Sequence, residues 1–196
     1  MIGSNGERPP RILGIGGSMR AGSRNLALLE EARRLAREAG AITILADVRE
    51  LDLPLFYPGQ DAVDGPPSLA WLLDEVRAAD AYLFCSPTYH GTVSGAVKNA
   101  LDALELLGDG YLEGKPVGLL ACGGPSATNT LNALHHAARA LKGLSVPTIV
   151  AVPGGGVEPL TGEVRDETVR RRLAAMVDEV LDLSRRLRAP AVVGVG

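Results

Sequence analysis

Short apolar runs alternate along the chain with longer segments in which apolar residues recur every three or four positions. The short runs have the length and the Val, Ile and Leu content of buried β-strands. Most of them run into residues that favour turns, such as Gly, Pro and Ser. The pattern predicts five strands, over residues 11–15, 42–48, 81–86, 117–121 and 146–152.

The longer segments between and after these strands have the period of amphipathic helices. In residues 25–39, the positions Leu28, Ala32, Leu35 and Ala39 place apolar side chains on one face, and Gly40 provides the stop. The last segment carries a similar apolar stripe over six turns. The predicted helices cover residues 25–39, 67–79, 93–107, 128–142 and 166–188.

This strict alternation of strands and helices predicts the fold class. Parallel strands need long crossovers, which helices usually provide, so the sheet should be parallel and covered on both faces. Five units are too few for an eight-fold barrel. We therefore expect an open doubly wound α/β domain in three layers over residues 1–196, with strand order 2-1-3-4-5. Ligand chemistry should lie beyond the first and third strands, after residues 15 and 86.

Composition and charge exclude several classes of function. The 196 residues are 46% hydrophobic and 22% charged, with a net charge of −3, so no broad basic field for a nucleic acid is expected. No apolar run reaches the length of a membrane span, and the start lacks the apolar middle of a secretory signal. We expect a cytoplasmic protein with residues 1–10 flexible and residues 189–196 loose or packed on a partner.

Neither the cysteines nor the histidine pair predicts a metal site. Cys85 and Cys122 each end an apolar stretch without CxxC spacing, which favours buried thiols. His135 and His136 are adjacent, so on a helix they point to different sides, which is poor geometry for one metal ion.

The loop after the first strand, GGSMRAGSRN at residues 16–25, has the chemistry of an anion site. Two glycines allow a tight turn, Ser18 and Ser23 offer hydroxyl donors, Arg20 offers a guanidinium, and the helix that follows adds its positive dipole. An ordinary turn with Ser23 or Asn25 as N-cap would explain one or two of these residues but not the dense set. The loop predicts phosphate binding.

Elimination narrows the kind of phosphate. A P-loop requires Lys and then Ser or Thr where Ser23 and Arg24 stand. The dinucleotide fingerprint begins at Gly14 and Gly16, but Met19 occupies the third glycine position. A terminal monophosphate remains, such as the one carried by FMN.

The second candidate loop follows the third strand, in SPTYHGTVSGAVKNALDAL at residues 86–104. Pro87 and Gly91 bracket Thr88, Tyr89 and His90, and a turn there would expose backbone groups and an aromatic edge suited to a flat heterocycle. Taken singly, Tyr89 is more simply interpreted as a partly buried aromatic residue and His90 as an exposed loop histidine. Beside a phosphate loop, a ligand role becomes the better interpretation.

Together, GGSMRAGSRN, SPTYHGTVSGAVKNALD and the CGG at residues 122–124 resemble the NADPH-dependent FMN reductase family of flavodoxin-like proteins. The resemblance covers nearly the whole chain. It implies FMN as cofactor and NADPH or NADH as co-substrate. By family motif it assigns the flavin phosphate to Ser18, Arg20, Ser23 and Asn25. The residues it assigns to the flavin ring are Pro87, Thr88, Tyr89, His90 and Gly91, with Gly123 and Gly124 in a third, weaker loop.

This chain departs from the family pattern at two ring positions and shares another segment with it. Many members have an acidic residue and Asn where Thr88 and His90 stand, so contacts to the pyrimidine edge of the flavin should differ. The long loop at residues 52–67 carries exposed apolar groups, typical of a lid or a subunit contact. Its start, DLPLF, resembles a family segment near a subunit interface, which implies a homodimer or homotetramer.

The resemblance also implies a mechanism. Hydride would pass from NAD(P)H to FMN and then electrons to a free flavin, a quinone or an azo dye, by ping-pong exchange at one site. No certain catalytic side chain is required; His90 is a candidate proton donor. Two alternatives stay open: a flavodoxin-type electron carrier without its own NAD(P)H reaction, and a flavin-free protein that binds another phosphorylated ligand.

Overall fold

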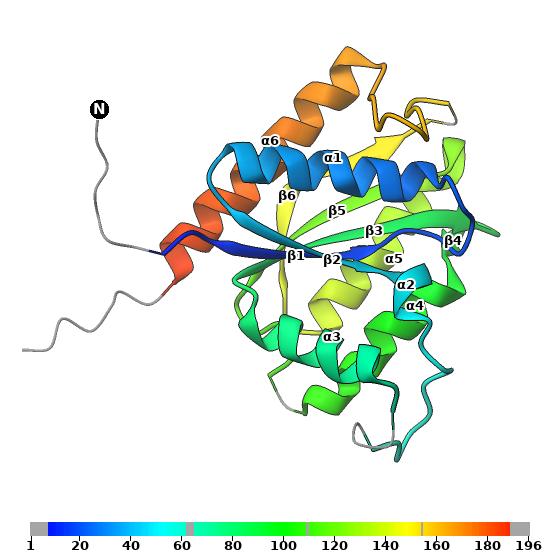
Figure 1. Cartoon of the computed structure of the whole chain (residues 1–196). Coiled ribbons are helices and arrows are strands. Elements are labelled where there is room, and N and C mark those ends of the chain that lie inside the picture. Colours follow the sequence, from blue (N-terminus) through cyan, green and yellow to red (C-terminus); the bar gives the residue numbers. More distant parts are fainter. Residues whose placement is uncertain (1–7, 62–64, 109, 154, 189–196) are drawn as a thin grey trace, which may run out of the picture.

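A parallel five-stranded sheet forms the centre of the molecule (Figure 1). The structure is a computed structural model and describes residues 8–61, 65–108, 110–153 and 155–188. The strands lie in the order β2-β1-β3-β5-β6, which is the predicted 2-1-3-4-5. Their bounds are Arg11–Gly16 (β1), Ile42–Asp47 (β2), Ala81–Tyr89 (β3), Pro116–Cys122 (β5) and Leu144–Val152 (β6).

Helices cover both faces of this sheet, as the alternation predicts. The first face carries α1 (Arg24–Glu38) and α6 (Glu167–Leu187), which lie above the sheet in Figure 1. The second face carries α3 (Pro67–Ala78), α4 (Gly95–Asp102) and α5 (Ala127–Ala140). Short helical turns complete the fold at Val48–Leu51 (α2), Ala103–Leu107 (η2) and Gly124–Ser126 (η3).

The strands are apolar at successive positions because both of their faces are buried. In β1, Leu13 and Ile15 pack toward α3, α4 and α5, whereas Ile12 packs toward α1 and α6. Parallel sheets in α/β proteins show this continuous burial, since helices lie on each side. After β1 and β3 the chain crosses to opposite faces, so a crevice opens between their carboxyl ends.

The structure differs from the predicted elements around the end of β3. The strand continues to Tyr89 and turns back as β4 (Thr92–Val93), which pairs with it antiparallel. His90 and Gly91 form the turn with φ of 50° and 82°, the backbone that a tight two-residue hairpin requires. The prediction that the strand ends at Ser86 was wrong. It took Pro87 as a turn signal, but proline is tolerated in a strand at a position where its missing N–H is not needed for a ladder hydrogen bond.

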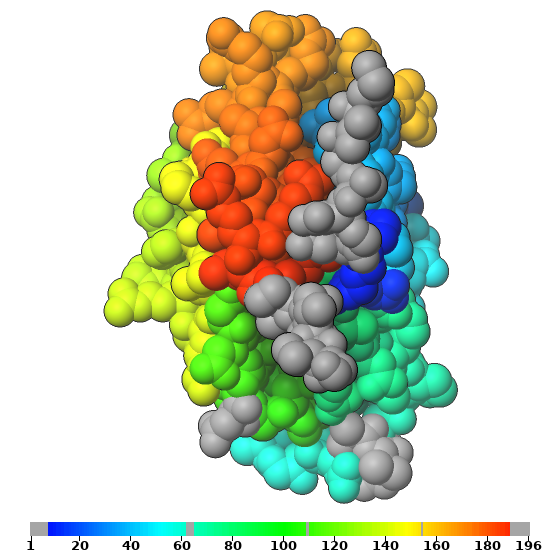
Figure 2. All heavy atoms as spheres, turned by 90° about the vertical axis from the view of Figure 1, so that its left-hand side faces the viewer, coloured from blue at the N-terminus to red at the C-terminus, as the bar shows by residue number. Residues whose placement is uncertain are grey.

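At the edge where the strands begin, the first described residues are tied to the domain. Figure 2 looks at this edge, where the last turns of α6, in red, lie beside the start of the described chain, in blue. Pro10 is buried, and its carbonyl accepts a hydrogen bond from Ile42 N at 2.8 Å. Of the terminal segments expected to be flexible or loose, residues 1–7 and 189–196 lie outside the described residues.

Asp80, directly before β3, bonds to residues at the start of the described chain. Its carboxylate accepts two hydrogen bonds from Arg8, each 2.7 Å, and one from Arg11 N at 2.8 Å. Burial by itself raises the pKa of Asp80, but these hydrogen bonds and the Arg8 charge outweigh burial, and the net pKa is lowered. A carboxyl whose pKa is lower in the folded state stabilises the fold above its unfolded pKa of about 4, and the contribution is lost as the pH falls through the folded value.

We expect Asp80→Asn to lower the free energy of unfolding by about 1–2 kcal/mol at pH 7, because the charge-assisted bonds to the arginine are lost. At pH 2.5 the difference between the variant and the parent should be smaller than at pH 7, since protonation of the parent carboxyl removes part of its contribution. Urea unfolding at both pH values measures this. Asp74→Asn, at an exposed ion pair with Arg77, is the control and should change stability little at either pH. A difference that persists unchanged at pH 2.5 would contradict the assignment.

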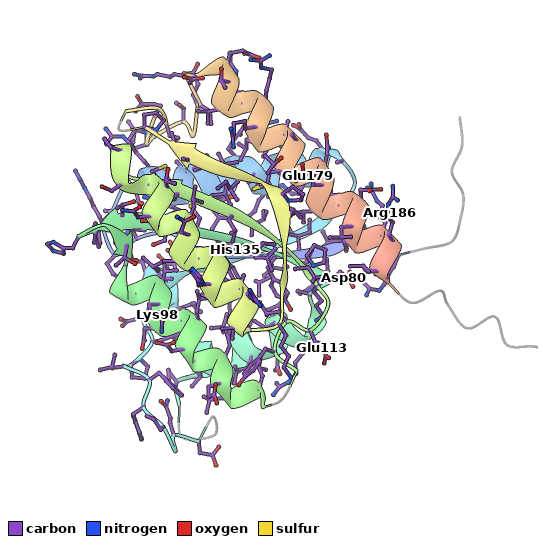
Figure 3. All side chains as sticks on the ribbon, turned by 180° about the vertical axis from the view of Figure 1, so that it is seen from behind. Asp80, Lys98, Glu113, His135, Glu179 and Arg186 are labelled. Atoms are coloured by element: carbon purple, nitrogen blue, oxygen red, sulfur yellow. The ribbon has the colours of Figure 1, made fainter. Side chains whose placement is uncertain are left out.

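The edge strand β6 has an irregularity that α6 covers. Val117 pairs with Ser145 and Leu119 with Ile149, so β6 contains extra residues at this point. Glu179 of α6 accepts hydrogen bonds from Thr148 N at 2.8 Å and from Thr148 Oγ1 at 2.6 Å. Figure 3 shows Glu179 on α6 beside this strand. The carboxylate thereby satisfies a backbone donor that the ladder leaves unpaired.

We expect Glu179→Ala to destabilise the protein by about 2 kcal/mol, because a partly buried N–H then has no partner. Chemical unfolding followed by circular dichroism measures the change. Asp178→Ala, at the exposed neighbouring position, is the matched control and should cost less than about 0.5 kcal/mol. Equal effects of the two variants would show that the Thr148 contact contributes nothing.

In the described residues, no helix is both long and apolar enough to cross a membrane. The same part of the chain contains no group of three or more His, Cys, Asp or Glu placed to hold a metal ion.

Candidate functional site

A cavity of about 240 Å³ lies at the carboxyl edge of the sheet, where the ends of β1, β3 and β5 come together. The loop after β1 and the end of β3 face each other across it, as the strand order predicts. The residues that line it are Ser18, Arg20, Gly22, Ser23, Arg24, Asn25, Pro87, Thr88, Tyr89, Cys122, Gly123, Gly124, Pro153 and Pro159. All the candidate residues except His90 and Gly91 are among them.

The loop at residues 17–23 leads into α1, and the first residues of this helix form one end of the cavity. Ser23 is the N-cap: its Oγ accepts hydrogen bonds from Asn25 N at 3.2 Å and Leu26 N at 3.4 Å. The ordinary capping role is therefore present beside the candidate ligand role. Ser18 Oγ accepts from Arg20 N at 3.2 Å and lies 3.1 Å from the Tyr89 hydroxyl, so it links the two loops.

Gly17 fixes the loop against its neighbours rather than facing the ligand. Its N–H donates to the Cys85 carbonyl at 3.3 Å and is therefore not available to an anion in the cavity. Its φ is 101°, and a Cβ there would lie 2.7 Å from Asp47 Oδ1. A glycine is required at this position because both the backbone angle and the available space exclude a side chain.

Asn25 connects the segments that form the base of the cavity. Its side chain is buried, and Oδ1 accepts a hydrogen bond from Cys122 N at 2.9 Å. The thiol of Cys85 also donates to the Asn25 carbonyl at 3.2 Å. These contacts join α1 to the ends of β3 and β5, so Asn25 positions the loop at residues 17–23 in addition to lining the cavity.

Thr88 lines the cavity opposite the loop after β1, and a residue of α5 contacts it. Thr130 of α5 is fully buried, and its hydroxyl donates to Thr88 Oγ1 at 2.8 Å. A Cβ on Gly123 would lie only 2.1 Å from Thr88 Oγ1. The glycine after β5 is therefore needed so that the two loops can approach each other, which gives a physical reason for the GG at residues 123–124.

His90 and Gly91 lie at the tip of the β3–β4 hairpin and do not line the cavity. His90 is exposed. The hairpin is anchored instead by Ser86, which is buried and whose Oγ accepts from Ser94 N at 3.0 Å. The geometry of this cavity gives no support to proton transfer by His90.

The electrostatics of the cavity favour an anion at the end formed by the loop after β1 and the start of α1. Arg20 and Arg24 line it and are exposed, and neither has a salt bridge to any described residue. Burial raises the pKa of the Cys122 thiol to about 12, although the nearby Arg24 charge lowers it, and burial also raises the pKa of the Cys85 thiol. Both thiols stay neutral at pH 7, so they add no negative charge to the site.

Five lining residues were not among the sequence candidates: Gly22, Arg24, Cys122, Pro153 and Pro159. Gly22 and Arg24 lie inside the quoted motif and could have been included with it. Pro153 and Pro159 belong to the segment after β6, which carries no motif, and only the packing of that segment on α1 brings them to the site.

The comparisons with known proteins agree with this geometry. The family model for NADPH-dependent FMN reductases matches residues 10–156. An NAD(P)H-dependent FMN reductase of Pseudomonas aeruginosa is 31% identical over 185 residues, which cover 91% of this chain and 97% of the relative. The NADPH-dependent FMN reductase ArsH of Acidithiobacillus ferrooxidans is 31% identical over 92% of this chain and 73% of its own length.

Among solved structures, the flavoenzyme FerB of Paracoccus denitrificans has a TM-score of 0.72 at 23% identity and covers 90% of this chain and 98% of its own. At that identity the likeness supports the fold alone. The expected resemblance is confirmed by the family match, by the relatives of similar length and by the sheet order. The chain belongs to the NADPH-dependent FMN reductase family.

Proposed function

We propose that the protein is an FMN-dependent oxidoreductase that takes hydride from NADPH or NADH and passes electrons to a small-molecule acceptor. One observation carries the proposal: a single cavity joins a phosphate loop at a helix N-terminus to the end of β3 at the switch point of the sheet. The family match and the names of the relatives support the same reaction class.

The residues present fit a flavin mononucleotide. Arg20, Arg24 and the positive end of the α1 dipole would hold the phosphate, with Ser18 and Ser23 beside them. Pro87, Thr88 and Tyr89 would lie along the ring. A Cβ on Gly124 would meet nothing within 4 Å, so the missing side chain there leaves room for a flat group against the backbone.

Bound FMN would supply the redox chemistry, accepting a hydride and returning two electrons. This chain's own residues bind and orient. Tyr89 is half exposed and lines the cavity, so its ring would contact the flavin at a side that solvent reaches. No side chain needs to act as nucleophile or base, and we assign no proton transfer to His90.

The same arrangement indicates how the nucleotide and the electron acceptor would use the site. We infer that one face of the bound ring stays open, so that the nucleotide and the acceptor bind there in turn, which gives ping-pong kinetics. A free flavin, a quinone or an azo compound would each fit this exchange, and relatives carry the names of FMN reductase, quinone oxidoreductase and azoreductase.

We also propose a homodimer or homotetramer. Leu55 and Tyr57 are 81% and 61% exposed, next to a groove of about 610 Å³ between the 56–59 segment, α4 and α5. Asn99 holds this segment in place through Phe56 N and the Pro54 carbonyl, at 2.8 and 2.9 Å. Light scattering that gives the mass of one chain would contradict the proposal.

The test of function is an absorbance experiment. The protein is mixed with FMN, desalted, and followed without oxygen after addition of NADPH and, in a second sample, NADH. We expect the flavin bands to stay with the protein and to bleach on addition of at least one nucleotide. Retained bands that do not bleach would favour an electron carrier, and bands lost on desalting would favour a flavin-free protein.

A further inference from the structure

A second cleft, of about 320 Å³, lies directly beside the phosphate end of the cavity. It runs between the outer face of α1 and the loop at residues 159–162, the yellow-to-orange segment next to the start of α1 in Figure 1. Gly22, Ser23 and Pro159 line both spaces. A ligand whose phosphate lies at the α1 N-terminus could therefore continue from one space into the other.

The loop that forms the far wall is held in place. It belongs to a short hairpin in which Val157 and Val164 pair, and both of these side chains are buried in the core. Glu158 N donates to the Glu163 carbonyl and Gly162 N to the Glu158 carbonyl, each at 2.9 Å. These bonds set the shape of the hairpin, and its two buried valines join it to the core that α1 also packs into.

At this tip, Leu160 is 91% exposed, although removing a leucine side chain from water is favourable. It lies over the cleft together with Pro159, and Leu26 and Ala27 of α1 form the facing side. These four residues provide an apolar slot open at one side. A flat, weakly polar ring would cover Leu160 and remove it from water.

The rest of the cleft is polar and balanced in charge. Glu30 and Glu31 face it with Arg34 and Arg37, so its formal charge is zero. Glu31 pairs with Arg34 at 2.7 Å, which orients the carboxylate on the helix surface. Carboxylates accept hydrogen bonds from ribose hydroxyls in nucleotide sites. A neutral nucleoside suits this wall better than a further phosphate would.

From these contacts we propose that the cleft holds the adenosine half of FAD, with the flavin half in the first cavity. The diphosphate would lie at the junction, where Arg20 and Arg24 and the start of α1 supply positive charge. This inference rests on the proposed flavin site. It adds that the site accepts a flavin extended beyond its first phosphate, either as cofactor or as acceptor.

The test compares FMN and FAD binding by titration calorimetry, in the parent protein, in Leu160→Ser and in the control Leu187→Ser. Leu187 is also an exposed leucine, near the end of α6. The parent should bind FAD at least as tightly as FMN. Leu160→Ser should weaken FAD binding about three- to tenfold, because part of the apolar slot is lost, and should change FMN binding less than about twofold. The control should change neither.

Three results would overturn the inference. The first is tight FMN binding with FAD at least tenfold weaker in the parent, which would leave the proposed function standing. The second is an equal effect of Leu160→Ser on both flavins. The third is a higher KM for NADPH in Leu160→Ser with unchanged FAD binding, which would place the adenosine of the nucleotide in this cleft instead. Failure of the parent to bind either flavin would remove the proposed function as well.

Discussion

Replacing both Arg20 and Arg24 by alanine is expected to weaken FMN binding about 100-fold. Each guanidinium lines the phosphate end of the cavity and has no salt bridge within the described residues, so each is free to bind an anion. A hydrogen bond to a charged group contributes about 1.5–3 kcal/mol, and two at the lower end correspond to about two powers of ten in the dissociation constant. Flavin fluorescence titration at low salt measures the change.

Arg77→Ala is the matched control for this variant. Arg77 is exposed on α3, on the other face of the sheet, and pairs only weakly with Asp74 there. Its loss should leave FMN binding unchanged. Salt gives a second check: the difference between the parent and the double variant should shrink at high ionic strength, because exposed charges are screened. An unchanged dissociation constant in the double variant would remove the phosphate assignment. Ser23 is unsuitable for this test, since its loss would also remove the N-cap of α1.

The second large effect is expected at Gly16, the last residue of β1. A Cβ at this position would lie 2.1 Å from the Cys85 carbonyl oxygen, which belongs to the backbone of the neighbouring strand. Neither strand can move away without breaking the ladder between β1 and β3. We expect Gly16→Ala to lower the free energy of unfolding by about 3 kcal/mol or to prevent folding, as overpacking in a core does.

Gly14→Ala, two residues earlier in the same strand, separates this clash from a general loss of strand flexibility. A Cβ there would meet only side chains, Leu29 Cδ1 at 3.1 Å and Arg33 Cδ at 3.2 Å, which can shift. Its cost should stay near 1 kcal/mol. Urea unfolding followed by circular dichroism compares the two variants, and equal stabilities would show that the backbone contact at Gly16 can relax.

Much of the fold and part of the site could be predicted from the sequence because their signals are local. Apolar runs followed by helical periods indicate a parallel sheet, and the crossover rules give its order. The glycines, hydroxyls and arginine after β1 lie within ten residues, so their chemistry was visible together. The helix N-terminus that they precede follows from the same stretch.

Other features depend on contacts between residues far apart in the chain. Asn25 carries the motif of a phosphate ligand, but its amide oxygen binds Cys122 N, a partner 97 residues away. His90 carries the chemistry of a proton donor, but β3 continues past Pro87 and places His90 on an exposed tip. Pro153 and Pro159 close the cavity without any local motif.

The sequence by itself therefore determined the layers, the strand order and the two loops that face each other, because hydrophobic period and turn chemistry act over short distances. Tertiary structure decided which side chains of those loops reach the cavity and which of them join strands instead. It also placed the hairpin at Val157 and Val164 beside α1, which forms a second cleft. These outcomes depend on how strands and helices approach each other in space, and a packing contact between distant segments leaves no periodic signal in either one.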